Sequence, residues 1–312
     1  MSDISAILIV RQGSTRLPGK GMKTILGRSL LSLIIERLKN INEISQICVA
    51  TSNLEIDQPI LDVAKEEGVI SYAGHPEDVL DRLYHASRVC NAKIIYEVGG
   101  DCPLVDRGTL VHAYQLMKNS RHDFVHNFAP TTYPDGLDCP LITYDCLERV
   151  HRGAVMSSHR IHPFSYIVSH PEEFSVGNFV YNRDCGHLRL TLDYPEDLKL
   201  LKEIFERLYP VNPYFTLEDV IELLEEHPDL PRINAHYVQP LSPEGYWNTL
   251  AYIDDLHDDL VVLIKATKTS NQDKQYGQAV KGYSEILHMV ANLKQRAIHL
   301  QNSQSDEVRH NI

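Results

Sequence analysis

The sequence of 312 residues predicts an α/β fold built on a doubly wound, mostly parallel sheet. Short, almost continuously apolar runs recur in the first hundred residues, as expected for strands buried on both faces of a parallel sheet. Segments with apolar residues at helical spacing lie between these runs. This alternation is typical of right-handed βαβ units stacked in one sheet.

The individual elements follow in chain order. The four apolar runs predict strands at residues 4–10, 46–51, 69–74 and 93–98. Ser29 and Asp57 stand where helix N-caps are expected, each just before a stretch of helical spacing. Beyond residue 123 the pattern predicts strands at 124–128 and 187–193 and helices at 195–209 and 216–226, the last opened by Thr216.

The chain divides into three predicted parts. Residues 1–240 form a nucleotide-binding domain, 241–300 a helical extension, and 301–312 a disordered tail. The extension contains two amphipathic stretches, 244–266 and 275–300, whose apolar stripes must be buried. The pattern leaves three alternatives open: the stretches could fold back on their own domain, pack against a second subunit or dock another protein.

Composition narrows the function classes. Thirty Lys and Arg against 42 Asp and Glu give a net charge of −12, which argues against a nucleic-acid partner but permits a local basic pocket. The apolar run at 4–10 is too short to span a membrane and follows no cationic segment, so we expect a cytoplasmic protein without membrane association. The six cysteines have no Cys-x-x-Cys spacing, which predicts reduced thiols and no structural zinc.

The loop after the first predicted strand has the composition of a polyphosphate site. Glycines allow backbone amides to approach phosphate oxygens, hydroxyls donate hydrogen bonds and cations supply charge. These roles fall on Arg11, Gly13, Ser14, Thr15, Arg16, Gly19 and Lys20. The loop is not a Walker A motif, because five residues separate Gly13 from Gly19 and because Gly21 replaces the required Ser or Thr. A solvated basic turn is the simpler alternative.

A carboxylate follows the fourth predicted strand at Asp101, within the segment 99–106. The carboxyl ends of neighbouring parallel strands meet at one edge of a sheet, so Asp101 should face the same region as the basic loop. Such an oxygen is a suitable ligand for a divalent cation bound to nucleotide phosphates. A strand-end turn or an N-cap is the alternative reading.

The ordered string 11–20 resembles the phosphate-binding signature of the cytidylyltransferase family that includes the SpsF-like spore coat polysaccharide enzymes and, more distantly, the CMP-Kdo and CMP-sialate synthetases. The similarity continues through 26–31, 49–52 and 77–82 and covers about residues 4–235. It implies a Rossmann-like nucleotidyltransferase fold related to the GT-A glycosyltransferases. It also implies CTP as the nucleotide and a homodimer, which the C-terminal helices would help to form.

The resemblance assigns roles to single residues. It implies catalytic roles for Arg11, Lys20, Asp101 and Asp193, with Mg²⁺ held by Asp101 and Asp193. CTP would be bound by Gly13, Ser14, Thr15, Arg16, Gly19, Thr51, Ser52, Asp81 and Arg82. The segment 132–138 matches the acceptor side of the family's pocket, which makes Tyr133, Asp135 and Asp138 substrate-binding candidates, although a Pro-Asp-Gly turn alone would explain the pattern.

Two departures from the family pattern bear on the substrate. Glu97 stands where relatives usually have a cation, and 157–160 reads Ser-Ser-His-Arg in place of a Glu-Arg-Glu-His run. The expected reaction is transfer of CMP from CTP to a sugar or sugar-phosphate acceptor with release of pyrophosphate, for surface polysaccharide or glycan biosynthesis. A GT-A glycosyltransferase that uses a preformed nucleotide sugar, or a catalytically silent scaffold, are the alternatives.

Overall fold

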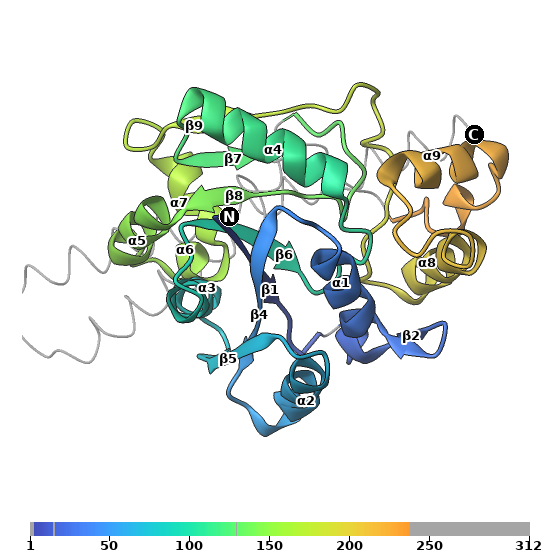
Figure 1. Ribbon diagram of the computed structural model, residues 1–312, viewed down its shortest axis with the longest axis horizontal. Coiled ribbons are helices and arrows are strands. Elements are labelled where there is room, and N and C mark those ends of the chain that lie inside the picture. Colours follow the sequence, from blue (N-terminus) through green and yellow to red (C-terminus); the bar gives the residue numbers. More distant parts are fainter. Residues whose placement is uncertain (1–2, 15, 129, 238–312) are drawn as a thin grey trace, which may run out of the picture. The chain divides into compact units, whose positions relative to one another are not determined.

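The computed structural model describes residues 3–14, 16–128 and 130–237, and its central feature is a seven-stranded sheet (Figure 1). The strand order is β5-β4-β1-β6-β8-β7-β9. The neighbours β5, β4, β1 and β6 are all parallel, whereas β8 runs antiparallel to both β6 and β7. The strands are β1 (Ile4–Ile9), β4 (Ile44–Ser52), β5 (Ile70–Gly74), β6 (Ile94–Gly99), β7 (Phe124–His126), β8 (Leu141–Thr143) and β9 (Val176–Asn178).

Helices cover both faces of this sheet. The described helices are α1 (Leu30–Lys39), α2 (Gln58–Glu66), α3 (Val79–Val89), α4 (Arg107–Ser120), α5 (Tyr144–Gly153), α6 (Ser157–Ile161), α7 (Pro163–Ser169), α8 (Pro195–Leu208) and α9 (Leu217–Glu226). Alternate residues of β1 enter two separate cores: Ala6 and Leu8 pack with α1, α2, α4, α8 and α9, while Ile7 packs with α3, α5 and α7. Both faces are therefore buried, which explains the continuous apolar runs.

Local sequence signals set several helix ends. The Ser29 side chain accepts a hydrogen bond from Ser32 N at 3.1 Å and caps α1, as predicted. Thr216 and Asp219 form a reciprocal capping box at α9. Asp57 occupies the N-cap position of α2, as predicted, but its carboxylate makes no capping hydrogen bond and instead accepts the backbone N–H of Gln12 at 2.7 Å.

The prediction of a strand at 187–193 was wrong. The segment is irregular and forms a single bridge, between Arg189 and Asp135. Its alternating leucines, Leu188, Leu190 and Leu192, are buried against the main core without a ladder of strand hydrogen bonds. The predicted helices 244–266 and 275–300 and the tail lie outside the described residues. Within the described part of the chain, no helix has the length and apolar character needed to cross a bilayer.

Candidate active site

Lys20, Asp101 and Asp193 meet beyond the carboxyl ends of β1 and β6. Lys20 begins the short 3₁₀ helix η1 (Lys20–Met22) after the β1 loop, and Asp101 follows β6. The Lys20 ammonium lies 2.6 Å from Asp101 Oδ2 and 2.9 Å from Asp193 Oδ1. Three of the four predicted catalytic side chains are thus brought together by contacts 81 and 173 residues apart in the chain.

Backbone hydrogen bonds position Asp193 without a strand. Leu192 N donates to the carbonyl of Asp101 at 2.9 Å, and Thr191 Oγ1 donates to the same oxygen at 3.3 Å. Gly136 allows a close approach on the other side, because its φ is +92° and a Cβ there would lie 2.7 Å from Thr191 N. The two aspartates are therefore fixed relative to each other by the main chain.

Arg189 is the central cation of the site that sequence reasoning missed. Its guanidinium contacts Asp135 at 2.8 Å, Asp193 at 3.2 Å and Asp197 at 3.0 Å, and only 10% of its side chain is exposed. Asn234 Nδ2 donates to Asp197 Oδ1 at 2.9 Å and closes the network. No local sequence signal identifies this set of partners, because Arg189 lies in an irregular segment and Asp135 is 54 residues away in the chain.

Neighbouring charges shift the pKa values of Lys20 and Asp193 in the direction opposite to burial, and the charges have the larger effect. Burial lowers the pKa of Lys20, but Asp101 and Asp193 raise it above its ordinary value. Burial raises the pKa of Asp193, but Lys20, Arg16 and Arg189 bring it below its ordinary value. Both groups are therefore charged at neutral pH.

Three further carboxyl groups near Asp101 have raised pKa values. Burial raises the pKa of Asp135 to about 6, against the opposing charge of Arg189. Loss of hydration, followed by repulsion from Asp135 and Asp101, raises the pKa of Asp138 to about 7, although its side chain keeps access to solvent. Burial and repulsion from Asp101 and Asp138 raise the pKa of Glu97 to about 8. This side of the site is consequently acidic, and its charge depends on pH near neutrality.

The loop before Lys20 is held by buried groups at the end of β4. Ser52 Oγ donates to the Asp57 carboxylate, which in turn accepts the backbone N–H of Gln12. Ser52 and Asp57 are each 1% exposed, so they hold the loop from its buried side. Gly19 adopts φ +66° and its N–H donates to the Gln12 carbonyl at 3.2 Å, which closes the loop.

The other predicted nucleotide-binding residues are distributed around this loop. Arg16 is 53% exposed and pairs with Asp193 at 3.0 Å. Gly13 is exposed, and Ser14 Oγ accepts the N–H of Leu17 at 3.4 Å. Thr15 lies outside the described residues.

Two arginines converge on one carbonyl beside the loop. Arg11 Nη1 donates to the Pro76 carbonyl at 3.3 Å, and buried Arg82 donates to the same oxygen at 2.8 Å. Arg11 is thus linked to the segment just before α3. Among the described residues, no contact is recorded between Arg11 and the group formed by Lys20, Asp101 and Asp193, here called the Lys20 cluster. Thr51 is fully buried, and its Oγ1 has no hydrogen-bond partner among the described residues.

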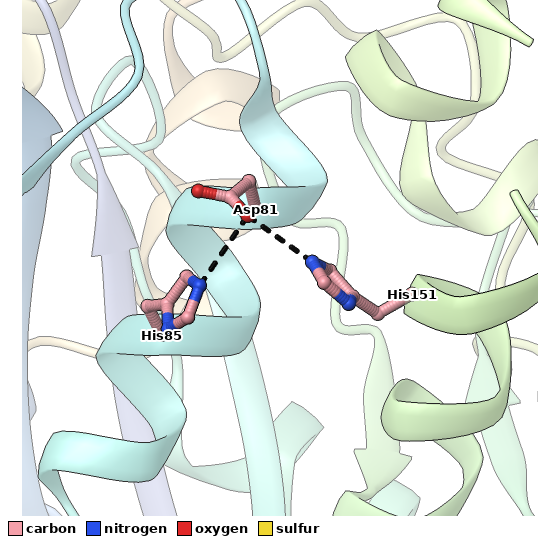
Figure 2. A group of neighbouring side chains, drawn as sticks. All are labelled: Asp81, His85 and His151. Atoms are coloured by element: carbon pink, nitrogen blue, oxygen red, sulfur yellow. Dashed lines mark hydrogen bonds and ion pairs between the residues drawn. The ribbon is translucent and has the colours of Figure 1, made fainter. Parts of the chain in front are cut away.

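Two predicted site residues face other surroundings. Tyr133 is 4% exposed, and its ring packs against Phe179 and Tyr181, with burial raising its pKa. Asp81 lies on α3 beside two histidines, His85 and His151 (Figure 2). The structure therefore does not group either residue with the Lys20 cluster.

The donor set of the cluster suits a magnesium ion. Asp101 and Asp193 present carboxylate oxygens to one point, where the Lys20 ammonium now contacts both. Mg²⁺ prefers one or two carboxylates together with phosphate oxygens, so these residues fit the ion that the sequence predicts. Lys20 would have to leave at least one carboxylate for the ion to bind.

Comparisons with known proteins identify the family of this chain. The profile of the cytidylyltransferase family matches residues 5–209. A solved cytidylyltransferase from Leptospira borgpetersenii is 29% identical, with a TM-score of 0.70 over 74% of this chain and 97% of that one. The spore coat polysaccharide biosynthesis protein SpsF of Bacillus subtilis is 26% identical over 237 residues, 73% of this chain and 97% of that protein.

A shorter match links the chain to a sugar-activating enzyme. The 3-deoxy-manno-octulosonate cytidylyltransferase of Trichlorobacter lovleyi is 32% identical over 112 residues, which are 36% of this chain and 44% of that protein. The family match covers most of the described domain and includes the loop, Asp101 and Asp193. The chain therefore belongs to the cytidylyltransferase family and is a nucleotidyltransferase.

Proposed function

We propose that this enzyme transfers CMP from CTP to a sugar or sugar-phosphate acceptor, releases pyrophosphate and serves surface glycan synthesis. The observation that carries the proposal is the Lys20 ammonium bridging Asp101 and Asp193 at 2.6 and 2.9 Å, beside a glycine- and arginine-rich loop. The family match supports the cytidylyl group, and the names of SpsF and of the Trichlorobacter enzyme support a sugar acceptor.

In this proposal an acceptor oxygen attacks the α-phosphorus of CTP, and the bond from that phosphorus to the bridging oxygen of pyrophosphate breaks. When bound by Asp101 and Asp193, Mg²⁺ neutralises phosphate charge and polarises the reacting phosphoryl group. Lys20 moves from the carboxylates to the triphosphate and stabilises charge on the leaving pyrophosphate. Arg16 is placed to join it, since it lies 3.0 Å from Asp193 and 53% of its side chain is exposed.

The acidic side of the site is the proposed acceptor side. Asp138 is solvent-accessible and has a pKa of about 7, so its carboxylate is substantially populated at neutral pH and accepts the proton of the attacking hydroxyl. Asp135 is held by Arg189 and fixes the wall of the site beside it. Loss of the carboxylate in Asp138→Asn should lower kcat and remove the acidic limb of its pH profile.

The proposal is tested by incubating the enzyme with CTP, Mg²⁺, inorganic pyrophosphatase and a panel of sugars and sugar phosphates. Acceptor-dependent phosphate release with CTP, and not with UTP or ATP, is expected. Asp101→Asn and Asp193→Asn should each reduce this rate by at least about a hundredfold. Asp229→Asn, at an exposed position, is the matched control and should keep the wild-type rate.

Three results would contradict the proposal. Consumption of a nucleotide sugar without pyrophosphate release would identify a glycosyltransferase. Absence of turnover with every acceptor, together with no binding of CTP, would indicate a scaffold. Full activity of a folded Asp101→Asn or Asp193→Asn variant would remove that residue from the reaction.

A further inference from the structure

A second cluster of potential metal ligands joins α3 to α5 and shares no residue with the Lys20 cluster. Asp81 lies in the first turn of α3, His85 lies one turn later, and His151 belongs to α5. Asp81 Oδ1 is 3.4 Å from His85 Nε2 and 3.1 Å from His151 Nε2, and both rings face this oxygen in Figure 2. All three ligand atoms lie within 4.8 Å of one another.

The two separations from Asp81 Oδ1 are close to those of ligands around one small ion. Zinc binds imidazole nitrogen and carboxylate oxygen at about 2.0–2.2 Å, which places neighbouring ligand atoms of a tetrahedral site about 3.3–3.6 Å apart. The i, i+4 spacing puts Asp81 and His85 on one face of α3, so only α5 has to supply the third ligand. The main chain therefore holds the three groups near binding geometry before any ion arrives.

Hydrogen bonding alone does not satisfy this cluster. His151 Nε2 lies 3.1 Å from the acceptor Asp81 Oδ1 and 3.4 Å from the donor Arg160 Nη2. If His151 Nε2 is protonated, it can donate to Asp81, but its N–H then faces the N–H of Arg160. If Nε2 is unprotonated, it can accept from Arg160, but its lone pair then faces the Asp81 oxygen. A cation that takes the lone pairs of Asp81 and both imidazoles ends the competition for Nε2, provided that Arg160 Nη2 turns to Asp78, which it already contacts at 2.7 Å.

The charge balance also permits a divalent ion. Arg160 is the cation nearest the cluster, and its Nη2 and Nε contact Asp78 at 2.7 and 2.8 Å. Asp78 is the nearer carboxylate of Arg160, whose Nη2 also lies 3.7 Å from Asp81 Oδ1. An ion bound to Asp81 would replace this longer ion pair, while Asp78 would still neutralise Arg160. The face of Tyr84 stacks on the His151 ring, with centroids 4.1 Å apart, and fixes its plane.

We propose that Asp81, His85 and His151 form a zinc site that ties α3 to α5, with water in the fourth position. Two imidazoles and one carboxylate favour Zn²⁺ over Mg²⁺, which prefers an all-oxygen set. The site supports the nucleotide loop indirectly, because Arg82 of α3 and Arg11 of the loop donate to the same Pro76 carbonyl. This assignment gives Asp81 a role other than contact with CTP.

The test measures metal binding by the full-length, metal-stripped protein and does not depend on turnover. Competition with a chromophoric chelator should show about one equivalent of Zn²⁺, and Co²⁺ in its place should give visible absorption bands of a four- or five-coordinate site. His85→Gln and His151→Gln should each weaken Zn²⁺ binding at least about tenfold and abolish the Co²⁺ bands. The exposed His187 supplies the matched control, and His187→Gln should bind like wild type.

Circular dichroism verifies that each variant is folded. His85 is the safer position for this purpose, since 37% of its side chain is exposed and its loss should not disturb the core. Equal Zn²⁺ affinity of wild type and folded His85→Gln, or wild-type protein that takes up no equivalent of Zn²⁺, would overturn the proposal. Bands that persist in His85→Gln and disappear in Asp101→Asn would assign the ion to the Lys20 cluster instead.

Discussion

Replacing Lys20 by Met should destabilise the protein and, at the same time, improve its binding of Mg²⁺ in the absence of nucleotide. The ammonium of Lys20 is the counter-charge between Asp101 and Asp193, at 2.6 and 2.9 Å. Without it, the two carboxylates face each other. Among the described residues, Arg16 and Arg189 still pair with Asp193 but not with Asp101. A divalent ion then has no internal competitor for the two oxygens.

The magnitude follows from distance and exposure. Two unit charges about 4 Å apart interact by about 4 kcal/mol at the effective dielectric constant near 20 that suits protein sites. Part of this is offset, because the variant no longer desolvates an ammonium, and Asp101 keeps 31% of its side-chain exposure. We therefore expect a loss of about 2–3 kcal/mol in the free energy of unfolding at pH 7.

The stabilisation that Lys20 provides should depend on pH in one direction. Lys20 contributes to a lowered pKa of Asp193 in the folded state, so its stabilisation is complete above the unfolded Asp value near 4. It is lost as the pH falls through the lower, folded value. The difference between wild type and Lys20→Met should accordingly be largest at neutral pH and shrink below about pH 4.

Urea denaturation with and without millimolar Mg²⁺ measures both effects. Mg²⁺ should restore most of the stability of Lys20→Met, and titration calorimetry should show at least about tenfold tighter Mg²⁺ binding than in wild type. Lys23→Met is the matched control, because Lys23 lies three residues away and forms no ion pair among the described residues. Unchanged stability of Lys20→Met, combined with unchanged Mg²⁺ affinity, would refute the reasoning.

Further predictions concern the loop, a buried histidine and a buried arginine. Arg11→Ala should weaken CTP binding far more than CMP binding, and calorimetry giving equal losses would show that Arg11 does not reach the distal phosphates. Burial lowers the pKa of His126 to about 4, so the unfolded state takes up more protons between about pH 6.5 and 4 and stability falls as the pH drops. Between pH 7 and pH 5, the free energy of unfolding from urea denaturation should fall by about 2 kcal/mol less in His126→Phe than in wild type. An equal fall in both proteins would disprove this linkage. Arg37 donates to the carbonyls of Val105, Pro213 and Phe215, so Arg37→Met should cost about 3–5 kcal/mol in the same assay, and a cost below about 1 kcal/mol would show that water replaces these bonds.

The sequence predicts those parts of the fold that depend on neighbouring residues. The four parallel strands and the caps at Ser29 and Thr216 were found because burial on two faces and capping leave local patterns. The segment 187–193 was mistaken for a strand because its leucines alternate. That alternation arises from burial of one side of a chain that hydrogen bonds to Asp101 and Asp135 instead of a neighbouring strand.

The site was predictable only where a motif marked it. Lys20, Asp101 and Asp193 stand in recognisable segments, and the structure places them together. The roles of Arg189 and Asn234 were missed because Arg189 lies in an irregular segment without periodicity, and because the contacts to Asp135 and from Asn234 span 54 and 37 residues. The role of Tyr133 in substrate binding stays a prediction; its ring is buried beside Phe179, a packing that local sequence does not reveal.

The pairing of Lys20 with Asp193 has a consequence for the order of events during protein synthesis. The N-terminal loop and Asp101 emerge from the ribosome long before residues 189–197, and Asn234, which secures Asp197, emerges later still. The nascent chain can build β1, α1, β4 and β6 early, yet at that stage Lys20 lacks Asp193, one of its two carboxylate partners. Closing contacts across 173 residues is slow compared with forming a helix, so competence for nucleotide chemistry arrives only when the domain is essentially complete.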